Sequence, residues 1–133
     1  MHKGSCLCGA VRYEITGELG PIMLYHCSKC RKASGSAFNA VSAVSVRNYH
    51  LLSGQEAIAK YESSPGIRLA FCRLCGSSLF SERDSMPDLL RVRIGTLDTP
   101  VGTKPAAHIF VGSKADWFDI HDGAPQHAER PAS

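Results

Sequence analysis

The sequence lacks a long apolar run, a strong charge of either sign and the common nucleotide-binding and hydrolase motifs. No segment approaches the ~20 consecutive apolar residues of a membrane-spanning helix. The formal net charge of +3 is too small to predict binding to nucleic acid or to a membrane surface. There is no Walker loop, dinucleotide-binding glycine pattern, nucleophile elbow or H-E-x-x-H zinc motif. The first residues also lack the apolar stretch of a secretory signal, so we expect a cytoplasmic protein.

Long helical periodicity is also missing, and short alternating runs take its place. These runs predict a mainly β fold of short antiparallel strands, separated by turns rich in glycine, proline and serine. The expected strands cover residues 10–16, 38–46, 58–62, 67–71, 78–82, 90–94 and 107–111. One short helix is expected over 29–33, with Ser28 as its N-cap and Gly35 ending it in a left-handed conformation. A plain turn is the alternative at this length.

The chain of 133 residues has the length of a single domain, and no internal linker interrupts it. We expect one domain over residues 1–125. Residues 126–133 are polar and include Pro131, which predicts a flexible tail.

Cysteine is the unusual component of this composition. The six cysteines form three close pairs, with the spacings C-x-C, C-x-x-C and C-x-x-C: Cys6 and Cys8, Cys27 and Cys30, Cys72 and Cys75. A framework of disulfides is the alternative, but the pairing and the missing signal favour metal binding or thiol chemistry.

The first and third pairs together offer four thiolates for one closed, tetrahedral zinc site. Gly9 follows the first pair and Gly76 the third, so each pair can sit in a tight turn. We therefore predict a structural zinc held by Cys6, Cys8, Cys72 and Cys75. Buried free cysteines, local redox pairs and an iron–sulfur cluster are the alternatives.

The middle pair, Cys27 and Cys30, is surrounded by positive charge and precedes a serine–glycine turn. Two cysteines at this spacing can hold a second zinc with an open position for a substrate thiolate or carbonyl oxygen. The residues expected to receive substrate carboxylates are Arg31, Lys32, Ser34, Gly35 and Ser36. A redox dithiol and a pair that only packs are the alternatives.

Three ordered motifs resemble the glutathione-dependent formaldehyde-activating enzyme (Gfa) and centromere-protein-V family. They are G-S-C-L-C-G-A-V from residue 4, H-C-S-K-C-R-K from residue 26 with G-S-A-F from residue 35, and F-C-R-L-C-G-S from residue 71. Segments around residues 95–98, 105–111 and 117–118 agree, so the resemblance spans residues 4–125.

The resemblance implies a zinc-braced β-tent, a structural zinc at the first and third cysteine pairs, and a second zinc near Cys27 and Cys30. It also implies a carbon–sulfur lyase whose partners are glutathione and formaldehyde. At the second zinc the two would combine to S-hydroxymethylglutathione.

One position departs from the family pattern, which has a cysteine where this chain has Tyr25. Tyrosine is a poor zinc ligand at neutral pH because its ordinary pKa is about 10. A distant histidine such as His108 could complete the second site after folding, or the site is incomplete or empty. The alternative function is therefore a non-catalytic, zinc-braced binding module.

Three further residues have a structural interpretation. Phe38 and Trp117 are expected in the core, although either could line a small pocket. His108 lies in an apolar run and is expected to be a hydrogen-bonded core histidine.

Overall fold

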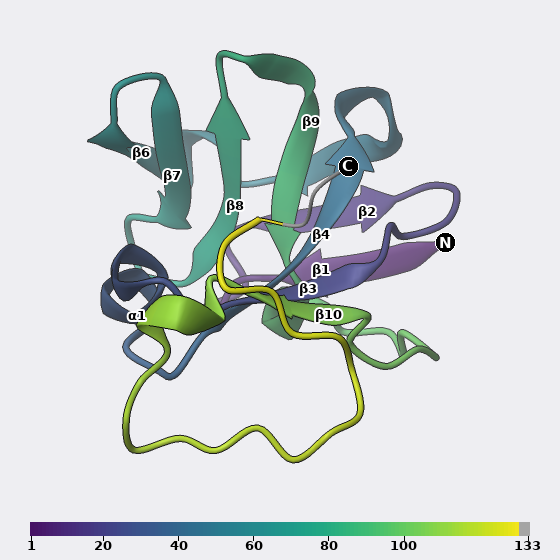
Figure 1. Ribbon diagram of the computed structural model, residues 1–133. Coiled ribbons are helices and arrows are strands. Elements are labelled where there is room, and N and C mark those ends of the chain that lie inside the picture. The colour runs from purple at the N-terminus through teal and green to yellow at the C-terminus, as the bar shows by residue number, and fades with distance from the viewer. Residues whose placement is uncertain (131–133) are drawn as a thin grey trace. The chain divides into compact units, whose positions relative to one another are not determined.

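The computed structural model, drawn in Figure 1, describes residues 1–130. These residues form two compact units. The first unit comprises residues 1–20 and 42–102, and the second comprises residues 21–41 and the segment from Thr103 onward. The mainly β fold with one short helix is confirmed. No helix in the described chain is long and apolar enough to cross a membrane.

The first unit contains two groups of antiparallel strands. Strands β1 (His2–Ser5), β2 (Arg12–Ile15) and β5 (Tyr49–Ser53) pair in the order β1-β2-β5. Strands β6 (Ile58–Ser64), β7 (Ile67–Cys72), β8 (Ser78–Arg83) and β9 (Met86–Arg93) follow one another as a meander. Short 3₁₀ turns lie at Val46–Asn48, Gln55–Ala57 and Ile94–Thr96. Four of these strands, β2, β6, β7 and β8, fall within two residues of the predicted ranges.

The second unit is built around two parallel strands, β3 (Ile22–Tyr25) and β10 (Ala107–Ile109). Helix α1 (Ser28–Ser34) follows β3, and a 3₁₀ turn at Val111–Ser113 follows β10. The strand β4 (Asn39–Ser45) begins in the second unit and ends in the first. The β3–β10 pair is parallel, which is an exception to the expected antiparallel pairing. Its register places Leu24 opposite His108.

The segment after residue 125 is held by backbone hydrogen bonds. The N–H of His127 donates to His108, and the carbonyls of residues 127–129 accept from residues 110–112. These bonds place the backbone of residues 127–129 beside that of residues 108–112. The flexible tail over 126–133 stays a prediction, and residues 131–133 lie outside the described residues.

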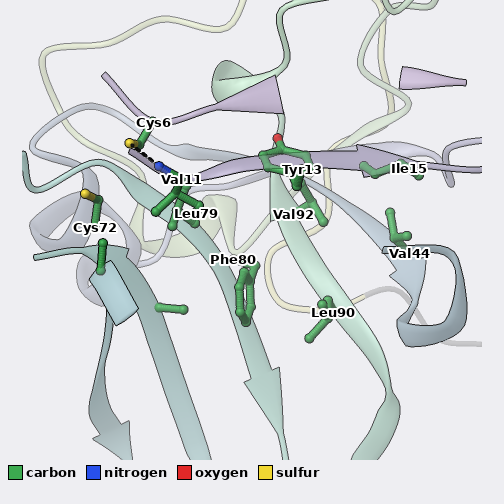
Figure 2. Close-up of a cluster of buried hydrophobic side chains, with 12 residues drawn as sticks. Cys6, Val11, Tyr13, Ile15, Val44, Cys72, Leu79, Phe80, Leu90 and Val92 are labelled. Carbon is green, nitrogen blue, oxygen red and sulfur yellow. Dashed lines mark hydrogen bonds between the residues drawn. The ribbon is translucent and has the colours of Figure 1, made fainter. Parts of the chain in front are cut away.

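The core of the first unit combines β2 with the meander (Figure 2). Val11, Tyr13 and Ile15 are fully buried, as the alternation along this strand predicts. Cys6 and Cys72 belong to the same cluster and lie at one end of it. Two of the predicted metal ligands are therefore fixed by the packing of the core itself.

An ion-pair network joins β7 to β8 in the same unit. Arg68 donates from Nε to Glu82 Oε1 at 2.8 Å and from Nη2 to Asp84 Oδ1 at 2.7 Å. Burial raises the pKa of Glu82, but hydrogen bonds from Arg68 and Lys60 outweigh it and leave the pKa lowered. The Arg68 guanidinium likewise lowers the pKa of Asp84.

Candidate metal centre and thiol site

The first and third cysteine pairs converge in the first unit. The Sγ atoms of Cys6 and Cys8 are 3.6 Å apart and those of Cys8 and Cys72 are 3.8 Å apart. With Cys75, all four sulfurs lie within 4.8 Å of one another. A tetrahedral zinc with bonds of ~2.3 Å to each sulfur needs sulfurs about 3.8 Å apart. The donor set and its spacing therefore fit a closed, four-coordinate metal ion.

Two turns, each closed by a backbone hydrogen bond from its glycine, present these sulfurs. The carbonyl of Cys6 accepts from Gly9 N at 3.1 Å, and the carbonyl of Cys72 accepts from Gly76 N at 2.7 Å. Both glycines have the left-handed φ angles, 80° and 83°, that favour glycine. The expectation that each glycine permits a tight turn is confirmed.

Ser77 connects the two turns. Its Oγ accepts from Leu7 N at 2.8 Å and lies 3.3 Å from Cys75 Sγ. Since the oxygen accepts from Leu7, its own hydrogen is available to the sulfur. The hydrogen bond from Ser77 is the main cause that lowers the pKa of Cys75 to about 5. A lowered pKa favours the thiolate, which is the form that binds metal.

The middle pair begins helix α1 in the second unit. Cys27 is the N-cap, and its Sγ accepts from Cys30 N at 3.3 Å. The prediction that Ser28 caps the helix is wrong by one residue, because a cysteine side chain replaces the usual hydroxyl. Gly35 ends the helix at φ 65° as predicted, with its N–H donating to Arg31 O. Interaction with Cys30 is the main cause that lowers the pKa of Cys27 to about 6.

No third ligand joins this pair among residues 1–130. The four-cysteine cluster is the single group of three or more metal-ligating side chains there. His108 does not complete the site, because its ring nitrogens contact His26 and Asp122 instead. A second zinc at Cys27 and Cys30 stays a prediction.

The residues expected to bind substrate carboxylates differ in whether their N–H groups already have a hydrogen-bond acceptor. The N–H of Gly35 already donates to Arg31 O, and the N–H of Ser36 donates to Ser34 Oγ at 3.2 Å. By contrast, Arg31 Nε is buried and has no hydrogen-bond partner in the part of the chain described. A guanidinium N–H in that position is a donor that a carboxylate can satisfy.

Three hydrogen-bonded side chains, His26, His108 and Asp122, begin at the residue before Cys27. His26, fully buried, places Nε2 at 2.8 Å from Nδ1 of His108, which is 2% exposed. His108 Nε2 lies 2.9 Å and 3.0 Å from the two carboxylate oxygens of Asp122. The prediction that His108 is a hydrogen-bonded core histidine is confirmed.

Neighbouring groups shift the pKa values of Asp122 and His26. The hydrogen bond from His108 is the main cause of a lowered pKa at Asp122. Burial lowers the pKa of His26, and the nearby His108 and Lys114 lower it further. Both shifts favour an ionised Asp122 beside a neutral His26.

Aromatic rings surround His26. The ring of Phe38 lies 5.4 Å from it and that of Phe118 lies 6.3 Å from it, centre to centre. Phe38 packs against these rings but is only half-buried, and Trp117 is 68% exposed, so its predicted place in the core is wrong. Trp117 contacts Phe118 edge-on from outside.

Sequence reasoning did not identify His26 and Asp122 as partners of His108. Asp122 lies at the start of a polar stretch without periodicity, and His26 stands out only as the first residue of the H-C-S-K-C-R-K motif. The one local signal was a histidine within an apolar run at 106–110.

Comparisons with known proteins show the family of the chain. The family model of the glutathione-dependent formaldehyde-activating enzyme matches residues 1–113. A Halomonas elongata protein, named as a candidate glutathione-dependent formaldehyde-activating enzyme, is 29% identical over 126 residues, covering 89% of this chain and 80% of that protein. An uncharacterised lyase of Schizosaccharomyces pombe is 32% identical over 79 residues, 59% of this chain and 56% of the relative.

Among solved structures, the crystal structure of a Rhodobacter sphaeroides protein matches with a TM-score of 0.62 at 27% identity. The match covers 77% of this chain and 91% of that one. Because the family model covers most of the chain, the resemblance in its cysteine motifs is confirmed. The chain belongs to the glutathione-dependent formaldehyde-activating enzyme family.

Proposed function

We propose that the protein joins glutathione to formaldehyde, and splits the adduct in the reverse direction, at a site around Cys27 and Cys30. In this reaction the thiol sulfur bonds to the aldehyde carbon while the carbon–oxygen double bond becomes single. The thiol proton ends on that oxygen, so nothing is oxidised or reduced. The product is S-hydroxymethylglutathione, and the reaction is of the carbon–sulfur lyase type.

The observation that carries this proposal is the pairing of two thiols at the start of α1 with the unpartnered guanidinium Nε of Arg31 one residue further on. Glutathione has one thiol and two carboxylates, and these are the groups that such a site can recognise. Lys32, exposed on the same short helix, adds a second positive charge for a carboxylate. Family membership supports the same substrates.

We assign zinc to the four-cysteine cluster, where it has a structural role because all four positions are filled by sulfur. A second zinc at Cys27 and Cys30 would lower the pKa of a bound substrate thiol when present. The chain's own part is to hold the two sulfurs on one side of the helix start and to offer Arg31 to the substrate.

The test is the rate of S-hydroxymethylglutathione formation above the spontaneous rate. Cys27→Ser and Cys30→Ser should both fall to the spontaneous rate. Arg31→Gln should raise KM for glutathione with a smaller effect on kcat, because the carboxylate is bound equally in substrate and transition state. Arg47→Gln, at an exposed arginine of the first unit, is the matched control and should behave as wild type. Wild-type rates equal to background would refute the proposal.

The missing third ligand favours a second candidate, a zinc-braced module that binds its ligand without chemistry. Elemental analysis of protein purified without added metal separates the two. Two zinc ions per chain, falling to one in the Cys27→Ser/Cys30→Ser double variant, support the enzyme. One zinc in both proteins, with no turnover, supports the binding module.

A further inference from the structure

His26 Nδ1 is an unusual atom in the second unit. It is buried and has no hydrogen-bond partner among residues 1–130, although the other ring nitrogen is bonded to His108. Buried polar atoms nearly always have a partner, and leaving one without costs free energy. Such an atom is able to form a hydrogen bond with a further group.

The protonation of this atom follows from the chain of contacts. A carboxylate only accepts hydrogen bonds, so His108 Nε2 must donate to Asp122. In a neutral His108 the other nitrogen, Nδ1, then carries a lone pair and accepts from His26 Nε2. In a neutral His26 that leaves Nδ1 without a proton. With both imidazoles neutral, the contact with Asp122 therefore selects the tautomer of His26 in which Nδ1 accepts a hydrogen bond.

The surroundings define which partner fits an unprotonated nitrogen. The rings of Phe38 and Phe118 flank the imidazole, which favours a small group with an apolar part. The nitrogen itself accepts, so the group must be a donor. Shared metal binding with Cys27 and Cys30 is not favoured, because these three residues do not form a metal-ligating cluster.

We propose that His26 Nδ1 accepts a hydrogen bond from the hydroxyl of the hydroxymethyl group in S-hydroxymethylglutathione, with His108 and Asp122 as positioning residues. This inference rests on the proposed function. The hydroxymethyl group has one hydroxyl donor and one methylene, which suit the nitrogen and the rings. His26 immediately precedes Cys27, so the acceptor belongs to the same chain segment as the proposed thiol site. The adduct would thereby be distinguished from free glutathione.

Binding and nitrogen-15 NMR of the full-length, zinc-loaded protein test this inference. The first probe is S-hydroxymethylglutathione, made from glutathione with excess formaldehyde. The matched probe is S-methylglutathione, which lacks the hydroxyl and is titrated in the same formaldehyde concentration. Wild type should bind the first about fivefold more tightly, which corresponds to a hydrogen bond of about 1 kcal/mol. The Nδ1 resonance of His26 should show an unprotonated nitrogen and should shift with the first probe alone.

Two variants separate the acceptor from general packing. His26→Phe keeps a ring between the aromatic neighbours and should lose the fivefold preference. Asp122→Asn, at an exposed position, should let His26 populate both tautomers and should reduce the preference without loss of folding. Asp119→Asn, at an exposed aspartate three residues earlier, is the control and should keep the preference.

The outcomes are distinct from those of the proposed function. If both probes bind equally, or if His26 Nδ1 is protonated in the free protein, this inference is wrong while the proposed reaction stands. If neither probe changes any resonance of the protein, the proposed function fails and this inference with it. Equal loss of preference in Asp119→Asn and Asp122→Asn would also overturn the role of the Asp122–His108 contact.

Discussion

The hydroxyl of Ser77 lies 3.3 Å from the sulfur of Cys75 while it accepts a hydrogen bond from the backbone of Leu7. One small side chain thus connects a sulfur of the four-cysteine cluster in one turn with the backbone of the other turn. Groups that orient metal ligands in this way commonly contribute 10- to 100-fold to metal affinity.

We therefore predict that Ser77→Ala lowers zinc affinity by about 10- to 100-fold. Competition with a zinc chelator measures this directly. Ser77→Thr retains the hydroxyl and should recover most of the affinity. Ser78→Ala, at the next residue, is the control, and equal affinities of wild type and Ser77→Ala would contradict the prediction.

Removal of the metal should unfold the first unit. Structural zinc supplies about 10–16 kcal/mol of binding free energy, which is comparable with the whole stability of a small domain. Cys72 is fully buried, so Cys72→Ser should lower Tm as strongly as a chelator does. Zinc should restore the chelated wild type and magnesium should not, since thiolates do not suit magnesium. An unchanged Tm after verified metal removal would show that the cluster has no structural role.

Substitutions of Cys27 should separate its thiol from its role as helix cap. Serine is a good N-cap, so Cys27→Ser should keep the stability of wild type while losing activity. Cys27→Ala loses the cap as well and should be less stable than Cys27→Ser by about 1 kcal/mol. Urea unfolding of both variants measures the difference. Equal stabilities would mean that the 3.3 Å contact with Cys30 N contributes nothing.

The packing of Tyr13 should make Gly4 irreplaceable. The two residues are opposite each other in β1 and β2, and a Cβ on Gly4 would overlap the fully buried Tyr13 ring. Gly4→Ala should destabilise the protein by about 1–3 kcal/mol, the usual cost of overpacking. Gly95→Ala is the matched control, because nothing lies within 4 Å of its added Cβ. Thermal unfolding that ranks the two variants equally would disagree with this packing.

The network around Arg68 should stabilise the protein above about pH 4. Glu82 and Asp84 have lowered pKa values when folded, so their ionised forms add stability above the unfolded values of about 4. That stability is lost as the pH falls through the lowered folded values. Arg68→Gln should therefore be less stable than Arg47→Gln at pH 7, and the difference should shrink below about pH 4. Urea midpoints at several pH values measure it; a constant difference down to pH 3 would contradict the ion-pair account.

The sequence predicts some parts of this molecule well because they depend on neighbours in the chain. Alternation places Val11, Tyr13 and Ile15 in the core, and the glycines after two cysteine pairs predict the tight turns. Strands β1, β3 and β5 were not predicted, since their residues do not alternate between apolar and polar. Local pattern is sufficient for the two cysteine turns and insufficient for strands without alternation.

Other parts depend on contacts between distant segments. His26 and His108 are 82 residues apart in the chain, and only the parallel pairing of β3 with β10 brings them together. Asp122 joins them from a stretch whose polarity suggested no defined place. The histidine chain is thus a product of topology that no local spacing reveals.

The four-cysteine cluster has a consequence for the synthesis of the protein on the ribosome. Sulfurs at residues 8 and 72 are separated by 64 positions, so a ribosome must add that many residues after Cys8 before the two can share an ion. Until then Cys6 and Cys8 offer only two thiols, which can be oxidised or can bind other metal ions. Newly made chains should therefore depend on the cell's reducing capacity before they depend on its zinc supply.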